Sequence, residues 1–152
     1  MMSRAQKRLQ KELEEMRTNF ADMFEVQLGN EGQNVMTWLV TFNGAEGSVY
    51  EGERYTLEFK FDQDYPIEAP EVVFKGNYPH HEHVYSNGYI CLSILYDDWS
   101  PSLKVSSVVL SILSMLSSAT EKARPHNDSS FIRYANGRSP KTFNWVFEDE
   151  KC

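Results

Sequence analysis

Cysteine is scarce in this sequence: only Cys91 and Cys152 occur among 152 residues. Two cysteines so far apart do not make the dense disulfide framework that stabilises small secreted domains. The N-terminal stretch, "MMSRAQKRLQKELEEM", contains no apolar segment of the kind that opens a secretory signal. Together these absences favour a reducing compartment, and we expect a cytoplasmic and nuclear location.

Positive charge and long hydrophobic runs are also in short supply. The chain has 15 Lys and Arg residues against 22 Asp and Glu, for a formal net charge of −7, so nucleic acid is not an expected partner. The longest apolar run, "VVLSILSML", is too short to span a bilayer. What is present, 41% hydrophobic and 13% aromatic residues, suffices for one core, and we expect a single domain over residues 1–152.

The first element indicated by the pattern is a helix over residues 3–17. Leu9, Leu13 and Met16 recur at helical spacing, and Ala5 and Phe20 extend the stripe. The expected outer face is charged, first by cations and then by acids: Arg4, Lys7, Arg8, Lys11, Glu12, Glu14 and Glu15. Cations in a first turn oppose the helix dipole, which suggests that this end serves as a docking surface.

Four short strands are predicted next, at residues 23–28, 36–42, 54–61 and 71–74. Alternation is clearest in "RYTLEFKF", where every second residue is apolar. The intervening "GNEGQ", "NGAEGS" and "DQDYP" are rich in turn-forming residues. Because no helix separates the strands, they predict an antiparallel meander with one solvated face, the other covered by the first helix.

After the strands, residues 75–101 show no regular period, yet they are too apolar for disorder. A long irregular loop of this kind often carries a site. A central helix is predicted at about 104–118 and a short one at 129–136. The final stretch, about 137–152, mixes aromatic and acidic residues and fits either a docked or a mobile tail.

The irregular loop contains the residues best suited to catalysis or metal binding. His80, His81, His83 and Cys91 could suggest zinc, but structural zinc sites usually draw short-spaced ligand pairs from two places. We therefore expect neither a metal nor a cofactor. A cysteine protease would need a paired base and a lowered thiol pKa, whereas Asp97 and Asp98 would raise that pKa. From spacing alone, Cys91 as an inert packed residue is favoured.

The order of segments carries a stronger signal than any one motif. An amphipathic helix, a four-stranded meander, "YPIEAPEVVF", "HEHVYSNGYICLSIL", "WSPSL" and a central helix follow one another between residues 5 and 118. This series closely resembles the ubiquitin-conjugating enzyme family, which implies its α+β fold. Tyr65, Pro66 and Pro70 match the family's Y-P-x-x-x-P turn, and Gly88, Trp99 and Pro101 match the framework of its active-site loop.

The resemblance implies a function and partners. In that family the cysteine of G-x-I-C-L, here Cys91, accepts ubiquitin as a thioester from an ATP-dependent activating enzyme. It then passes the ubiquitin to an amine of a protein substrate, usually with a RING-type ligase bound. The implied surface for the activating enzyme and ligase comprises Arg4, Lys7, Arg8, Lys11, Ile67, Ser100, Pro101 and Ser102. Ile67 stands where many members have Phe, which argues against HECT-type partners and leaves RING types open.

Departures from the family pattern are informative. The family's His-Pro-Asn is here His81-Glu82-His83, so His83 inherits the position of the Asn, either as a donor near the oxyanion or as a loop-holding residue. Ser93 replaces the acid that commonly follows C-L, and "ATEKARPHND" replaces the acidic P-N-P-D-D-P segment. The long helices that usually end the domain are replaced by a short tail.

These departures favour an acceptor that needs no acidic activation. At neutral pH about 0.1% of a lysine side chain is free amine, against roughly a fifth of an α-amine. The sequence is most similar to W-type members, which attach ubiquitin to protein N-termini and share a short tail with Trp near its end. Trp145 then either helps to hold a flexible substrate terminus or merely packs the tail. The alternatives are lysine-directed conjugation and a non-catalytic variant that binds ubiquitin or a ligase.

Overall fold

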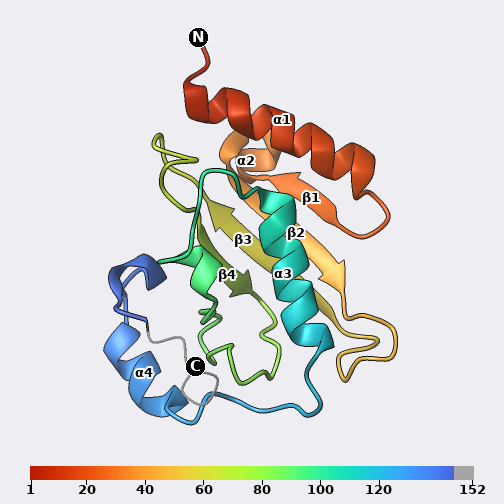
Figure 1. The fold of residues 1–152 in the computed structure, drawn as a ribbon, viewed down its shortest axis with the longest axis vertical. Helices are drawn as coiled ribbons and strands as arrows, with labels where there is room; N and C mark the ends of the chain where they lie inside the picture. The colour runs from red at the N-terminus through yellow and green to blue at the C-terminus, as the bar shows by residue number, and fades with distance from the viewer. Residues whose placement is uncertain (146–152) are drawn as a thin grey trace.

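The computed structural model describes residues 1–145 and shows the expected α+β architecture (Figure 1). The elements are α1 (Arg4–Asn19), β1 (Glu25–Leu28), α2 (Gly29–Gly32), β2 (Asn34–Asn43), β3 (Arg54–Lys60), β4 (Glu71–Lys75), η1 (Ser93–Leu95), α3 (Val105–Ser117), α4 (Asp128–Ala135) and η2 (Pro140–Thr142). The predicted helices and strands are all confirmed, with ends shifted by a few residues. Only the short elements α2, η1 and η2 were not predicted.

The four strands form one antiparallel sheet in the order β1-β2-β3-β4, which confirms the meander. Alternation of side chains across the pleat explains its two faces. Trp38 lies opposite Phe59, and Val40 opposite Leu57, so buried residues pair with buried residues. A register slip of one residue would turn this set to solvent.

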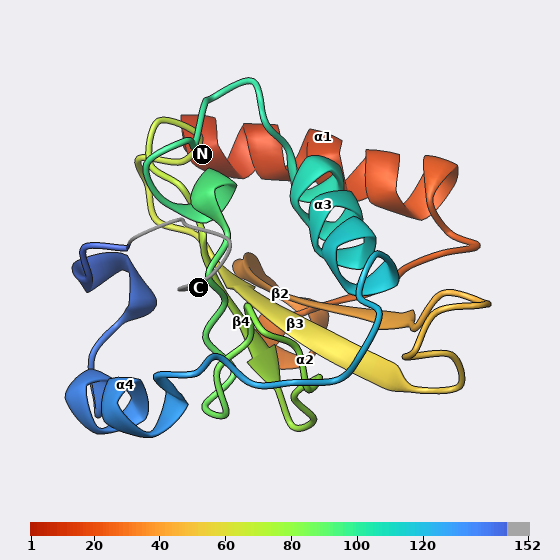
Figure 2. The ribbon, with the colours of Figure 1, turned by 60° about the horizontal axis from the view of Figure 1, so that its bottom comes forward.

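Two helices lie on the apolar face of the sheet (Figure 2). The predicted stripe of α1 is buried, and Ser3 caps the helix by accepting from the N–H of Gln6. α3 is central, as predicted, with the apolar residues Val105, Val108, Val109, Ile112 and Leu116 buried. One expectation for α1 was wrong: Glu12 does not belong to the outer face but is 4% exposed.

The short elements have simple physical origins. α2 occupies the predicted "GNEGQ" turn, where Asn30 and Glu31 adopt left-handed backbone with φ of 51° and 54° and turn the chain tightly from β1 to β2. η1 lies inside the irregular loop, and its Leu95 is buried in the main core. The loop is therefore packed although it has little regular structure.

The tail is docked as far as the structure describes it. Lys141 donates to the carbonyl oxygen of Ala69 at 2.6 Å, and Ser139 donates to Glu71 at 2.8 Å. Residues 146–152, which belong to the predicted tail, lie outside the described residues. Within residues 1–145 no helix has the length and apolarity needed to cross a membrane.

Gly88 and Gly47 offer a matched test of how tightly the irregular loop is built. Both have positive φ, +90° and +82°, but a Cβ at Gly88 would lie 2.6 Å from the carbonyl oxygen of Phe74, whereas one at Gly47 would meet nothing within 4 Å. Alanine at either position should cost about 1–2 kcal/mol of backbone strain. We expect Gly88→Ala to lower the free energy of unfolding by at least about 1 kcal/mol more than Gly47→Ala in urea titrations. Equal losses of unfolding free energy in the two variants would show that the loop can shift to accommodate the added Cβ.

Candidate active site

Cys91 lies in the loop between β4 and η1, directly after the fully buried Ile90. Its backbone N–H donates to the carbonyl oxygen of His83 at 2.8 Å. The segment between them is closed by a second bond, from the N–H of Tyr85 to the carbonyl oxygen of Tyr89 at 2.9 Å. Two backbone bonds thus fix the chain that leads into Cys91, whose residue surface is 4% exposed.

His81 organises the approach to Cys91. Its Nδ1 accepts from the backbone N–H of His83 at 2.9 Å, so its Nε2 carries the proton and donates to the carbonyl oxygen of Met115 at 3.2 Å. Burial, followed by the neighbouring His83, lowers the pKa of His81. The neutral ring therefore joins the loop to the end of α3.

The structure brings His83 next to Cys91 through its backbone. Its carbonyl holds the N–H of Cys91, while its side-chain Nε2 lies 3.8 Å from Glu82. Its buried Nδ1 has no hydrogen-bond partner among the described residues. Of the two roles that the sequence left open, holding the loop is the one that these contacts support.

Aromatic side chains surround Tyr85 and Cys91. Tyr89, Phe131 and Trp145, together with the aliphatic Ile132, pack against this pair. Phe131 stacks on Tyr85 with ring centroids 3.8 Å apart, and Trp145 stacks on Tyr96 at 4.7 Å. The indole N–H of Trp145 donates to Pro140 at 2.8 Å. Trp145 is thus both near the cysteine and fixed by its own packing, so the contacts fit either of its proposed roles.

The N-terminal end of α4 holds the same loop from outside. Asn127 accepts from the hydroxyl of Tyr85 at 3.1 Å, and Asp128 accepts from the N–H of Ser86 at 2.8 Å. The carboxylate of Asp128 is therefore used in a loop contact. In the described residues no group of three or more His, Cys, Asp or Glu side chains could hold a metal ion.

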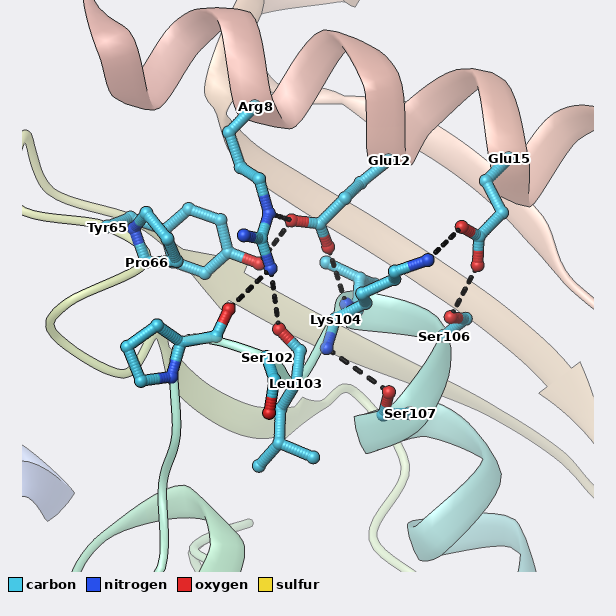
Figure 3. A network of polar contacts seen from close by, with 12 residues as sticks. Arg8, Glu12, Glu15, Tyr65, Pro66, Ser102, Leu103, Lys104, Ser106 and Ser107 are labelled. Atoms are coloured by element: carbon cyan, nitrogen blue, oxygen red, sulfur yellow. Dashed lines mark hydrogen bonds and ion pairs between the residues drawn. The ribbon is translucent and has the colours of Figure 1, made fainter.

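A second cluster lies where α1 meets the loops before β4 and α3 (Figure 3). The buried carboxylate of Glu12 accepts from Arg8 Nε at 2.7 Å, from the Tyr65 hydroxyl at 2.6 Å and from the N–H of Val105 at 2.7 Å. Burial, followed by the charge of Glu12, raises the pKa of Tyr65. One carboxylate thus links the first helix, the Tyr65–Pro66 turn and the start of α3.

Arg8 extends this cluster to the other predicted docking loop. Its Nη2 donates to the carbonyl oxygens of Pro101 and Leu103, each at 2.9 Å (Figure 3). The indole of Trp99 donates to the carbonyl oxygen of Pro66 at 2.8 Å, so the two loops are also joined to each other. These bonds assemble the predicted docking residues into one face.

The members of that face are not equally available to a partner. Ile67 is 71% exposed, and Arg4, Lys7, Lys11, Pro101 and Ser102 are also exposed, while Ser100 is half-buried. The guanidinium of Arg8 is directed inward to Glu12 and the loop carbonyls. In the structure Arg8 therefore holds the face together, and the exposed residues present its surface.

The sequence of the chain matches known proteins along nearly its whole length. The family described as "Ubiquitin-conjugating enzyme" matches residues 8–147. The chain belongs to the ubiquitin-conjugating enzyme family. It is 52% identical over 150 residues to a probable ubiquitin-conjugating enzyme E2 W of Dictyostelium discoideum, covering 99% of each chain. It is 43% identical over 151 residues to the ubiquitin-conjugating enzyme E2 W of Caenorhabditis elegans, again covering 99% of each.

The fold comparison agrees. The structure of this conjugating enzyme superimposes on the ubiquitin-conjugating enzyme UbcA1 of Agrocybe aegerita with a TM-score of 0.80 and 40% sequence identity, covering 92% of this chain and all of the other. The α+β fold and the enzyme class implied by the sequence are therefore confirmed.

Several residues that build the site were missed by sequence reasoning. Glu12 gave a signal, because with Ala5, Leu9 and Met16 it falls on the apolar stripe of α1, where a carboxylate needs buried partners. Tyr85 and Phe131 gave none, because their stacking joins segments 46 residues apart.

Removing the Glu12 carboxylate is expected to loosen the predicted docking face. Glu12→Ala leaves the Tyr65 hydroxyl, the Val105 N–H and Arg8 without their acceptor. We expect it to lower the free energy of unfolding by about 3 kcal/mol, as for other broken buried pairs. Glu14→Ala, on the exposed side of the same helix, should change it by less than about 0.5 kcal/mol. Urea titrations of both variants measure the difference, and similar small losses would contradict the buried role.

The His81 contacts predict a pH dependence of stability. Because the pKa of His81 is lowered in the folded state, the unfolded chain binds the extra proton as pH falls below its ordinary value of about 6.5. The contribution of His81 to the free energy of unfolding is therefore complete above about pH 6.5 and is lost below it. The free energy of unfolding should fall with pH there by at most about 1.4 kcal/mol per pH unit. His81→Asn should flatten this slope in urea titrations carried out between pH 5 and 7, a range of about two pH units over which a single group gains most of its proton. His80→Gln, at an exposed position, should keep the slope. An unchanged slope in His81→Asn would assign it to other groups.

Proposed function

We propose that Cys91 carries ubiquitin as a thioester and passes it to the α-amine of substrate proteins with a RING-type ligase bound. The family assignment supplies the chemistry. The Cys91 thiolate attacks the carbonyl of the activating enzyme's ubiquitin thioester and releases the activating enzyme's thiolate. A substrate amine then attacks the new thioester, so that an amide forms, the Cys91 thiolate leaves and the amine gives up a proton.

The observation that carries the role of Cys91 is its place in a loop built around it. Its backbone is fixed by His83, the loop is joined to α3 through His81, and α4 supports it at Tyr85 and Ser86. An inert packing residue needs no such arrangement of surrounding hydrogen bonds, whereas positioning of a reacting thioester depends on it.

The acceptor preference is supported by how the nearby acid is used. Ser93 stands where family members commonly have an acid, and the carboxylate of Asp128 accepts a hydrogen bond from the backbone N–H of Ser86. An α-amine needs less help to lose its proton, since its pKa of about 7.7–8.0 lies near neutrality. The α-amine is therefore the acceptor that this site suits best.

The docking face supports the partner assignments. Arg4, Lys7 and Lys11 present positive charge from α1, and Ile67, Pro101 and Ser102 present an adjoining, less charged surface. We assign this face to the activating enzyme and RING-type ligases, used in turn. Arg8 holds this face together through its hydrogen bonds to the carbonyl oxygens of Pro101 and Leu103. The scarcity of cysteine supports a cytosolic and nuclear site of action.

A charging assay tests the function. The protein is reduced so that Cys91 is a thiol, then incubated with activating enzyme, ATP and ubiquitin and run on a non-reducing gel. We expect a thiol-sensitive conjugate that is absent in Cys91→Ala and retained in Cys152→Ala. A conjugate that persists in Cys91→Ala, or none with the parent, would contradict the role of Cys91.

Discharge of the conjugate tests the acceptor preference. A peptide with a free α-amine and no lysine should discharge it at least about tenfold faster at neutral pH than a lysine peptide with a blocked N-terminus, in line with their free-amine fractions. Trp145→Ala should slow the reaction of the α-amine peptide without impairing charging if Trp145 contacts the substrate. Faster discharge to lysine would contradict the proposed preference.

A further inference from the structure

Arg124 is a cation held against the active-site loop, and no carboxylate in residues 1–145 forms an ion pair with it. It lies in "ATEKARPHND", the segment that replaces the family's usual acidic stretch after the central helix. Burial lowers its pKa, and the charge of Asp128 partly opposes this. Placing an arginine here has a desolvation cost, so its contacts with the loop must offset that cost.

Three backbone carbonyls of the loop accept from the Arg124 guanidinium. Nη1 donates to Pro79 and to Val84, the latter at 3.1 Å, and Nη2 donates to Tyr78 at 3.2 Å. The neighbouring N–H of Ala123 adds a bond to the carbonyl of His80 at 3.3 Å. The acceptors lie on both sides of His81-Glu82-His83, so the guanidinium closes the turn that carries both histidines.

We propose that Arg124 is a positioning residue for Cys91, acting through the backbone of His83. The chain of contacts is continuous: Arg124 fixes Pro79 and Val84, the turn between them places the His83 carbonyl, and that carbonyl holds the N–H of Cys91 at 2.8 Å. A planar fork with several donors reaches carbonyls at two ends of a turn, which a single ammonium group cannot reproduce. This inference rests on the proposed function of Cys91.

Single-turnover discharge of the Cys91 conjugate tests it, with the amine that the parent enzyme prefers. Arg124→Ala should discharge about tenfold or more slowly, because small displacements of a reacting centre are costly, and the loss should lie in the maximal rate and not in the half-saturating amine concentration. Guanidinium ion should restore part of the rate. The discharge rate of Arg124→Lys should lie between those of the parent and Arg124→Ala. Arg133→Ala, which removes an exposed arginine of α4, should discharge at the parent's rate.

Parent-like discharge by Arg124→Ala would overturn the proposal, and so would parent-like discharge by Arg124→Lys, which carries the test if the alanine variant does not fold. Backbone amide resonances provide a readout that needs no ubiquitin. Those of His83 and Cys91 should shift in Arg124→Lys and stay in place in Arg133→Ala, and unmoved resonances would overturn the positioning role. A parent protein that accepts no ubiquitin would contradict the proposed function, while the resonances would still decide the role of Arg124.

Discussion

The rest of the structure depends on one buried carboxylate, that of Glu12. Burying a charge is unfavourable unless it is paired and hydrogen-bonded, and Glu12 meets both conditions with Arg8, Tyr65 and Val105. Its partners come from α1, from the turn before β4 and from the start of α3, which are far apart in the sequence. One acid therefore fixes how the first helix sits on the domain and where the two loops predicted to dock partners lie.

The loop of Cys91 follows the same principle without a charged acceptor. Irregular backbone that packs against a core needs donors for its carbonyls, and here the side chain of Arg124 supplies them to Pro79 and Val84. His81 in turn donates from the loop to the carbonyl oxygen of Met115 in α3. Aromatic rings from α4 and the tail fill the remaining space around Tyr85. A regular strand or helix would not have given Cys91 this combination of fixed backbone and neighbours from three segments.

The sequence predicted the regular elements because their periodicity is local: alternation in β3 and helical stripes in α1 and α3 need only near neighbours. The role of Cys91 as a nucleophile was predicted from the resemblance to the family, since spacing alone favoured a packed thiol. Glu12 was misplaced on the outer face because charged residues were assigned to solvent by type. Arg124 and Phe131 could not be assigned, because their partners lie about 40 residues or more away and only the tertiary fold brings them together.

The most direct test of the central claim is to map where ubiquitin is attached to a folded substrate that has one free N-terminus and many surface lysines. The substrate is incubated with the charged enzyme, digested and analysed by mass spectrometry for the remnant of ubiquitin on each amine. We predict that the remnant appears on the α-amine, depends on Cys91 and disappears when the N-terminus is acetylated. Remnants spread over lysines, unchanged by acetylation, would contradict N-terminal conjugation.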